Sequence, residues 1–391
     1  YLFTLRLIPA FPFFVINMVM GLTRLRVPTY FWVSQLGMLP ATVVYVNAGT
    51  QIGQLESLAG ILSPQLIGSF VLLGLFPLLT RKLLTHFNAH KARRKAGPFS
   101  KPRAFDTNMV VIGAGSAGLV TAYIAAAAGA KVTLVEKDKM GGDCLNTGCV
   151  PSKALIRSSR IKAYIDRSRE FGISASRAET DFPAVMQRVR DVITTIEPHD
   201  SIERYTALGV DCVQGEARIS SPWSVEVNGR TINTRSIVIA TGGSPAVPPV
   251  PGLDETDYLT SDNLWTLTEL PQKLLVLGGG AIGCELAQAF RRLGSEVTIV
   301  EMLPRLLANE DEAVSAAIRN SFENDGIKVL TETRVTGFEN TADGGSVSIE
   351  HANRKQVIAL DKVLVATGRR GNSANLGLEA LGITGNADGT I

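Results

Sequence analysis

The sequence has few cysteines and, in its first quarter, almost no acidic residues. Four cysteines in 391 residues exclude the disulfide-dense scaffold of a small secreted protein. Charged residues make up 19% and hydrophobic residues 45% of the chain, which excludes a disordered protein because there is enough apolar material for a core. Residues 1–105 contain eleven Lys and Arg, one acid (Glu56) and 14 of the 25 aromatic residues. The remainder holds 28 basic and 35 acidic residues, so the net charge of +3 describes neither part and does not indicate binding to nucleic acid.

Long uncharged stretches dominate the first 105 residues. Three of them, 7–23, 27–55 and 57–80, contain no charged residue, and a membrane-spanning helix needs about 20 apolar residues. Gly and Pro interrupt all three stretches, which leaves re-entrant segments open. A signal peptide and a buried pair of soluble helices are the alternatives. Eight Lys and Arg then follow within 81–103, which by the positive-inside rule predicts that the downstream part is cytoplasmic; a solvated linker and contact with anionic lipid are further interpretations.

Short motifs in this region resemble a known family. They are Arg6-Leu-Ile-Pro9-Ala-Phe-Pro12-Phe-Phe, then Asn17, Gly21, Pro40 and Val46-Asn-Ala-Gly49. Together they are similar to the DedA-like membrane family, also called the SNARE-associated or VTT domain. The resemblance lacks the family's N-terminal part. It implies a multi-pass protein of the cell membrane in contact with lipid, with the rest of the chain in the cytoplasm.

The rest of the chain carries one dinucleotide-binding pattern twice. Each copy, at 107–136 and 273–301, has an apolar strand, a GxGxxG turn, a helix and a second strand followed by Glu, 23 residues after the first Gly. The first Gly permits a tight turn, the second the approach of a pyrophosphate and the third close packing of helix on strand, while the Glu accepts hydrogen bonds from a ribose. We therefore expect two dinucleotide sites, formed by Gly113, Gly115, Gly118 and Glu136 and by Gly278, Gly280, Gly283 and Glu301.

Two of the cysteines are five residues apart, in Gly141-Gly-Asp-Cys144-Leu-Asn-Thr-Gly-Cys149-Val-Pro151-Ser-Lys153. A regular helix places residues i and i+5 about 8.6 Å apart at Cα, beyond the ~7 Å limit of a disulfide. If the pair closes, the intervening Asn-Thr-Gly is therefore not regular helix, and Pro151 would open the next helix. Two cysteines make a poor structural zinc site, so we expect no metal, and inert core cysteines are the other alternative. A cycling dithiol and disulfide beside a flavin fits best.

Taken together, these motifs resemble the pyridine nucleotide-disulfide oxidoreductases, which include dihydrolipoamide dehydrogenase, glutathione reductase and mercuric reductase. The resemblance runs from about residue 106 to 391. It implies FAD at the first fingerprint and NAD(P)H at the second, where Glu301 would repel the 2′-phosphate of NADPH and so favours NADH over NADPH. Electrons would pass from NADH through the flavin to the cysteine pair and on to a small-molecule or protein disulfide or thiol substrate. Cys149 would be the thiol against the flavin, Cys144 the thiol that attacks substrate, and the full-length protein a homodimer.

Further site residues follow from the same resemblance. Lys153 and Glu285 match an ion pair near the reactive nitrogen of the flavin; alternatively, Lys153 is a surface residue and Glu285 complements a helix N-terminus. Ala217 matches a backbone contact to the adenine of FAD, and Val335 a contact on the nicotinamide side. The other expected cofactor-binding residues are Lys137, Gly142 and, in two Ala-Thr-Gly turns that end apolar strands, Thr241, Gly242 and Gly368.

We therefore expect an α/β protein with two Rossmann-like domains preceded by an α-helical membrane domain. The expected parts are a membrane domain (1–88), a basic linker (89–105), an FAD-binding domain (106–250), an NAD-binding domain (251–361) and a return to the FAD domain (362–391). The family's dimerisation domain and its His-Glu pair would lie beyond Ile391, so we expect a fragment at both ends. Two other functions stay open: an NADH dehydrogenase that reduces quinone, and a membrane transport or lipid-handling protein with a redox sensor.

Overall fold

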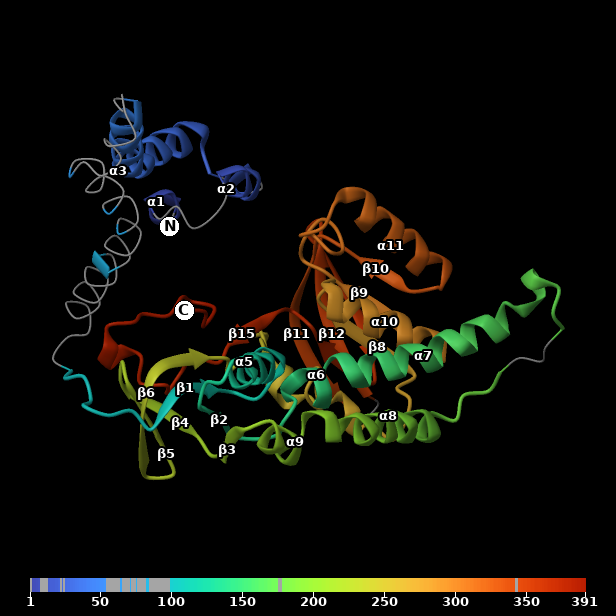
Figure 1. The fold of residues 1–391 in the computed structure, drawn as a ribbon. Helices are drawn as coiled ribbons and strands as arrows, with labels where there is room; N and C mark the ends of the chain where they lie inside the picture. Colours follow the sequence, from blue (N-terminus) through green and yellow to red (C-terminus); the bar gives the residue numbers. More distant parts are fainter. Residues whose placement is uncertain are drawn as a thin grey trace. The chain divides into compact units, whose positions relative to one another are not determined.

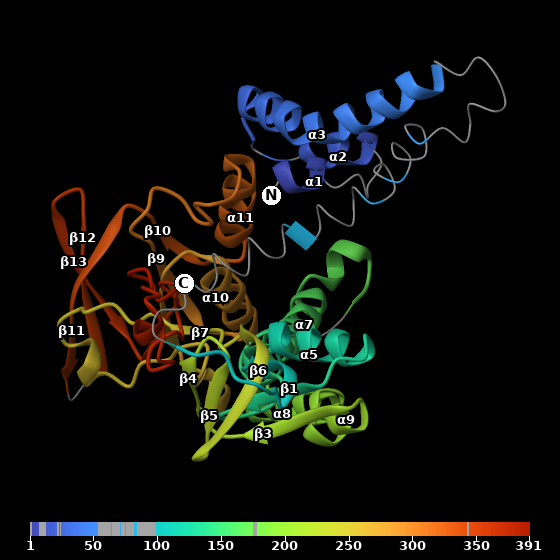
Figure 2. The same ribbon diagram turned by 60° about the vertical axis from the view of Figure 1, so that its left-hand side comes forward.

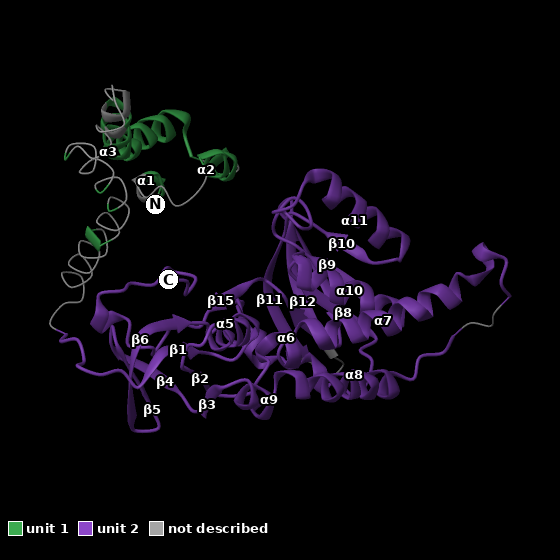
Figure 3. Cartoon of the chain, viewed as in Figure 1, with its two compact units in different colours: residues 1–98 green, residues 99–391 purple. Residues whose placement is uncertain are grey.

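The chain consists of two compact units, residues 1–98 and 99–391 (Figure 3). The computed structural model describes residues 2–7, 13–21, 23, 25–53, 64, 71, 75, 82–83, 99–174, 178–341 and 344–391. The division between the units falls inside the basic linker expected at 89–105.

Unit 1 is helical in its described part, with α1 (Leu2–Leu7), α2 (Phe13–Gly21) and α3 (Val27–Gly53) (Figure 1). The helices α1 and α3 pack at Gly37, where a Cβ atom would lie 2.8 Å from the Cβ of Arg6. Arg6 is buried, and its guanidinium donates to Asn17 Oδ1, to the Tyr30 hydroxyl at 2.6 Å and to Ser34 Oγ at 3.3 Å. Two of the VTT-like motif residues, Arg6 and Asn17, therefore contact each other.

Among the described residues of the whole chain, no helix is both long and apolar enough to cross a bilayer. The apolar stretch 57–80 lies outside the described residues except for three single positions, as does most of the basic run 81–103. The described surface of unit 1 is nevertheless rich in large apolar side chains; Phe14, Met18, Val27 and Trp32 are each more than 60% exposed.

Unit 2 begins with a six-stranded sheet in the order β3-β2-β1-β6-β5-β4. Its strands are β1 (Thr107–Ile112), β2 (Val132–Glu136), β3 (Val210–Gln214), β4 (Ala217–Ser221), β5 (Ser224–Val227) and β6 (Arg230–Ile239). The first three strands and β6 are parallel, whereas β4, β5 and β6 form an antiparallel meander. The connecting helices are α5 (Ser116–Ala127) between β1 and β2, and α6 (Gly142–Asn146), α7 (Cys149–Asp166), α8 (Phe182–Ile196) and α9 (Ile202–Ala207) between β2 and β3.

A second, fully parallel sheet has the order β10-β9-β8-β14. It consists of β8 (Lys273–Leu277), β9 (Glu296–Val300), β10 (Lys328–Leu330) and β14 (Lys362–Val365), with helices α10 (Ala281–Leu293) and α11 (Glu312–Asn324). An antiparallel sheet of β11 (Thr333–Thr341), β12 (Gly344–His351) and β13 (Arg354–Leu360) shares a core with it (Figure 2). Since β14 completes the second sheet, the chain leaves this half after Val365 and not at residue 362, which corrects the boundary expected from the sequence.

The last residues return to the first half through a short two-stranded ladder of β7 (Gly243–Pro245) and β15 (Arg369–Gly371). Beyond it, Leu376 and Leu378 are buried against Ile219 and Ile232 of the β4–β6 meander. The two halves also share a helical core, in which Leu155 of α7 and Met186 of α8 pack with Phe290 of α10 (Figure 1). Unit 2 is therefore an α/β protein, as expected, with one mixed and one parallel sheet, and its halves are joined by α7, α8 and α10.

The two GxGxxG turns have the same backbone geometry. Gly113 and Gly278 adopt φ of +102° and +110°, a region that favours glycine. A Cβ atom at Gly118 would overlap the carbonyl oxygen of Gly113, and one at Gly283 the carbonyl oxygen of Gly278. The third glycine of each motif is therefore required for the helix to approach its strand.

We expect Gly283→Ala to lower the free energy of unfolding by about 1–3 kcal/mol, because the new methyl group has no space against the Gly278 carbonyl. Gly280→Ala is the matched control, since no heavy atom lies within 4 Å of its Cβ position and its φ is −75°. Thermal unfolding of both variants measures the difference. Equal losses of stability in the two variants would contradict the assigned roles.

Candidate active site

The redox loop, defined here as residues 141–149, breaks between its two cysteines. Cys144 lies inside α6, which ends at Asn146, and Cys149 is the first residue of α7. The segment Thr147–Gly148 belongs to neither helix, whereas Asn146 is the last residue of α6, so the backbone between the cysteines is not one continuous helix. The helix begins at Cys149, two residues before Pro151, which corrects the expected start. Both cysteines are free thiols; Cys149 is exposed and Cys144 half-buried.

Hydrogen bonds within the redox loop hold its shape. The Asn146 side-chain amide donates to the carbonyls of Met140 and Gly142, both at 2.9 Å, and closes the turn that precedes α6. The backbone N–H groups of Thr147 and Gly148 both donate to the Asp143 carbonyl. The Asp143 carboxylate is in turn ion-paired with Arg369 of β15, which also donates to the Gly243 carbonyl.

The electrostatics of the pair act on Cys149 in two directions. A hydrogen bond with the Cys144 side chain, then partial burial, and then the charge of Cys144 raise the pKa of the Cys149 thiol above its ordinary value. The Lys153 ammonium, one turn along α7, acts in the opposite direction and favours the thiolate. In the dithiol state the net effect favours the thiol of Cys149 over its thiolate.

The expected Lys153–Glu285 pair is brought together by the packing of α7 on α10. Lys153 Nζ lies 2.5 Å from Glu285 Oε2, and the side chains are 60% and 46% exposed. An ion pair in such an exposed setting contributes about 0–1 kcal/mol to stability. Its position, between the redox loop and the second fingerprint, is therefore of more interest than its energy.

The acids that end β2 and follow β9 make equivalent contacts. Glu136 accepts hydrogen bonds from the N–H groups of Ala114 (2.6 Å) and Asp138 (2.9 Å). Glu301 accepts from Gly279 (2.6 Å) and Leu303 (2.7 Å). In each copy the first donor follows the first glycine of the fingerprint and the second lies two residues after the acid, so the duplication extends to single hydrogen bonds.

The residues of both fingerprints fit a dinucleotide. Gly115 and Gly280 are the N-cap residues of α5 and α10, whose free N–H groups and dipoles favour a pyrophosphate. The Cβ position of Gly280 faces open space, and the nearest atom to that of Gly115 is the Cα of Gly142, at 3.8 Å. A small side chain at either glycine would occupy the space that a pyrophosphate needs. The approach of Gly142 also brings the redox loop against the first fingerprint.

The remaining expected cofactor-binding residues are distributed around this frame. Lys137 is exposed directly after Glu136, whereas Ala217 is buried at the start of β4 and Val335 is buried in the core of β11–β13. Thr241 donates to the carbonyl of Asn372 at 2.7 Å, and the Asn372 N–H donates to the Gly242 carbonyl. The Gly368 carbonyl accepts from Ala246, so the two Ala-Thr-Gly turns flank the β7–β15 ladder.

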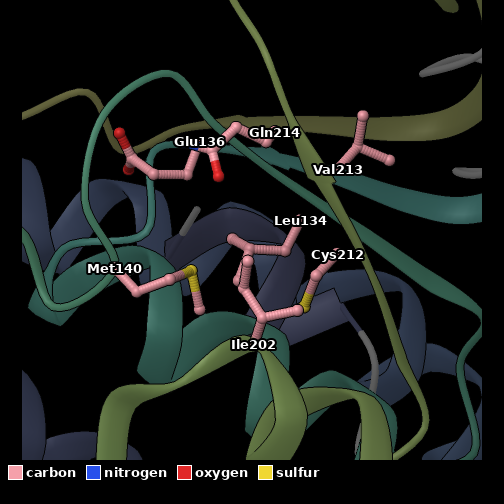
Figure 4. A pocket seen from close by; sticks show the side chains of 7 residues that line it. All are labelled: Leu134, Glu136, Met140, Ile202, Cys212, Val213 and Gln214. Atoms are coloured by element: carbon pink, nitrogen blue, oxygen red, sulfur yellow. The ribbon is translucent and has the colours of Figure 1, made fainter. Parts of the chain in front are cut away.

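A small recess lies beside Glu136 (Figure 4). It is lined by Leu134, Glu136, Met140, Ile202, Cys212, Val213 and Gln214.

Burial raises the pKa of the Cys212 thiol, and burial raises that of Cys284 to about 12. In both cases burial disfavours the thiolate, which is the reactive form of cysteine.

Comparison with known proteins agrees with this geometry. Residues 107–391 match the family model described as pyridine nucleotide-disulphide oxidoreductase. The chain belongs to this family. The family is FAD-dependent, uses NAD(P)H, acts on disulfide and thiol substrates and is typically homodimeric. Residues 1–51 match the model of the VTT domain, so both resemblances stated from the sequence are confirmed.

Several relatives show the same relationship for unit 2. A mercuric reductase of Staphylococcus aureus is 36% identical over 286 residues, which are 73% of this chain and 52% of that protein. A dihydrolipoyl dehydrogenase of Chlamydia pneumoniae is 36% identical, over 72% of this chain and 60% of that one. The solved structure of the HOCl-induced flavoprotein disulfide reductase RclA from Escherichia coli has a TM-score of 0.62 at 32% identity, covering 73% of this chain and 62% of that one. The chain thus spans about half to three fifths of the length of these relatives.

Some residues of this oxidoreductase site were not found from the sequence. They are Asp143, Trp265, Arg369 and Asn372, which tie the redox loop and the Ala-Thr-Gly turns to distant parts of the chain. Asp143 lies inside the quoted cysteine motif, but its carboxylate pairs with Arg369, which is distant in the sequence. The other three residues, Trp265, Arg369 and Asn372, follow apolar strands or turns, and their spacing in the sequence forms no recognisable motif.

We expect the Cys149 thiol, with both cysteines reduced, to react increasingly as pH rises through its elevated pKa, because only the thiolate is nucleophilic. Cys144→Ala removes the principal cause of the elevation and should move the pH profile of Cys149 alkylation to lower pH. Lys153→Gln should move it to higher pH. Iodoacetamide labelling followed by mass spectrometry measures both profiles, and shifts in the same direction would contradict the assignment.

Proposed function

We propose that this protein is a membrane-associated, FAD-dependent NADH:disulfide oxidoreductase whose Cys144–Cys149 pair cycles between disulfide and dithiol. The observation that carries the proposal is the position of the redox loop. Its Gly142 backbone touches Gly115 of the first fingerprint, and its second cysteine opens the helix that packs on α10 of the second. Among the relatives, the mercuric reductases and RclA are named for mercury and disulfide reduction, which supports a disulfide or a related thiol-reactive substrate here.

When bound, FAD would accept a hydride from NADH and supply two electrons to the cysteine pair. The Cys144–Cys149 bond then breaks, and the two thiols are completed by the proton that the hydride carried and by one further proton from solvent. Lys153 favours the thiolate of Cys149, whereas the Cys144 side chain favours its thiol. Cys144, half-buried within α6, is the thiol that we assign to attack on substrate: a substrate disulfide breaks, a mixed disulfide forms, and Cys149 displaces the second substrate thiol to restore the enzyme disulfide.

We expect two-electron reduction of the flavin-loaded protein to give a long-wavelength charge-transfer band from the Cys149 thiolate. Cys149→Ser should remove the band, because a serine hydroxyl does not ionise at this pH. Cys144→Ser is the matched control and should keep the contact between thiolate and flavin. Anaerobic titration with NADH measures both, and an unchanged band in Cys149→Ser would reverse the roles or refute the proposal. If a variant in which both Cys144 and Cys149 are replaced reduced quinone as fast as the unmodified protein, an NADH dehydrogenase would be favoured instead.

The second fingerprint supports NADH as the electron donor. In the proposed arrangement Glu301, which follows β9, faces the ribose, so that a 2′-phosphate of NADPH would meet a carboxylate; Arg305 is the nearest cationic residue along the chain. The Arg305 guanidinium is already held by the carbonyls of Ala308 (2.9 Å) and Glu310 (2.6 Å) and by Ser315 Oγ (3.0 Å). Release of these three bonds would be needed before Arg305 turned towards a phosphate.

We expect kcat/KM to favour NADH over NADPH by roughly tenfold to several hundredfold. Like charges about 4 Å apart cost ~1 kcal/mol in water and ~4 kcal/mol at an effective dielectric constant of 20. Glu301→Gln should narrow the ratio, because it removes the repulsion but keeps the size of the side chain. Steady-state kinetics with both nucleotides and a dye acceptor measure the ratio of the two kcat/KM values. A preference for NADPH in the unmodified protein would show that Glu301 does not face the ribose.

For unit 1 we propose association with the cell membrane through a multi-pass VTT-type domain. The match of residues 1–51 to the VTT domain and the exposed apolar side chains of α2 and α3 support this. Large apolar patches of this kind favour contact with lipid or with another protein over contact with water.

We expect unit 2 to lie on the cytoplasmic side, because eight positive charges within 81–103 follow the last apolar stretch. Protease added to sealed right-side-out cells should leave unit 2 intact and should digest it after permeabilisation. Digestion in sealed cells would contradict this topology.

A further inference from the structure

The carbonyl of Thr147, between the two cysteines, receives no backbone donor from α7. In a continuing helix it would accept from the N–H of the residue four positions on, but that residue is Pro151, which has no N–H. Unpaired carbonyl groups in such a setting carry a cost unless another donor is supplied. The sequence of the redox loop therefore creates a need for a donor from elsewhere in the fold.

Trp265 supplies this donor from the second half of unit 2. Its indole Nε1–H donates to the Thr147 carbonyl at 2.9 Å and is shared with the Ser261 carbonyl at 2.7 Å. The side chain is 8% exposed and packs in the core that joins α7, α8 and α10. The bond thus spans 118 positions of sequence to reach the residue midway between the cysteines.

The turn that carries Trp265 is itself fixed to the second sheet. Leu259 exchanges backbone hydrogen bonds of 2.7 Å with Val363 and Val365 on either side of its bridge to β14. The N–H of Thr260 donates to the Asn263 side chain at 2.7 Å and closes the turn before the 3₁₀ segment Leu264–Thr266. Displacement of Thr147 would therefore have to break the indole bond or distort a turn that is bonded to a buried strand.

We propose that Trp265 is a positioning residue for the redox loop, and that its indole N–H holds the Thr147 carbonyl in the geometry of the dithiol state. Both cysteines are free thiols in the structure in which this bond is formed. Any movement of Thr147 that closes the disulfide would strain this bond, so we expect the bond to favour the dithiol and to fix Cys149 at the start of α7. The inference rests on the proposed cycling of Cys144 and Cys149.

The test uses the flavin-loaded protein and two replacements of Trp265 that remove its N–H donor. Trp265→Phe keeps an aromatic ring in the core. Replacement of Trp265 by benzothienylalanine keeps the bicyclic shape as well, so that loss of packing is separated from loss of the hydrogen bond. Trp223→Phe is the matched control, because it removes an indole from the β4–β5 turn of the first sheet.

Two measurements report on the loop independently of turnover. The first is the intensity of the charge-transfer band per bound flavin after two-electron reduction. The second is the equilibrium between dithiol and disulfide in mixtures of reduced and oxidised dithiothreitol, read by alkylation and mass spectrometry. We expect both Trp265 replacements to lower the band at least about twofold and to shift the equilibrium about threefold to tenfold towards the disulfide, or ~14–30 mV for a two-electron couple. The control should match the unmodified protein.

An unchanged equilibrium and band in the benzothienylalanine protein would overturn the role of Trp265, as would a shift towards the dithiol. Failure of the proposed function gives a different result. In that case the unmodified protein would form no Cys144–Cys149 disulfide at any ratio of oxidised to reduced dithiothreitol.

Discussion

The packing of α7 on α10 is the contact on which the candidate site depends. Helix α7 begins at Cys149, and α10 begins at the second GxGxxG turn. Their buried side chains, such as Leu155 and Phe290, each contribute about 1.5–3 kcal/mol on removal from water. The Lys153–Glu285 ion pair between the same helices contributes about 0–1 kcal/mol, because both side chains are exposed. Apolar packing therefore places the ion pair, and the ion pair does not place the helices.

A second constraint orders the two candidate nucleotide sites: the hydrogen bonds of the equivalent acid in each fingerprint. Glu136 and Glu301 each accept two backbone N–H groups and so pin the glycine turn to the following loop. A carboxylate offers about four lone-pair positions, so each acid keeps capacity for ribose hydroxyls. The turn is thus ordered by protein contacts alone, which lowers the entropy cost of binding a nucleotide.

Local patterns in the sequence predicted the strands, the glycine turns and the break between the cysteines, because each depends on residues within about 30 positions of one another. The boundary at residue 362 was wrong for a physical reason. An apolar run such as Lys362-Val-Leu-Val predicts a buried strand, but nothing in it specifies whether the strand joins the first or the second sheet. The pairing of Lys153 with Glu285 was predicted from the family resemblance and not from the spacing of the two residues in the sequence.

The residues that the sequence did not reveal are those that bond across more than 100 positions. Trp265 resembles any other core aromatic residue, and its indole acquires a specific role only because Pro151 leaves the Thr147 carbonyl without a helical donor. Arg369 follows an apolar strand, and only the β7–β15 ladder brings it to Asp143. Such pairs depend on tertiary packing, which local periodicity does not encode.

The redox loop is consequently held from three directions by parts of unit 2 that are distant in sequence. Gly142 touches the first fingerprint, Asp143 is paired with the returning strand β15, and Thr147 is bonded to the turn before the second sheet. A loop held at residues 142, 143 and 147 has little freedom for rigid-body movement. If the proposed Cys144–Cys149 bond opens and closes, the change is accommodated by side-chain rotation and by small changes at Thr147–Gly148, the one segment between the cysteines that lies outside a helix. This limits the cost of reorganisation in each cycle, and it makes the contact at Thr147 the place where that cost is set.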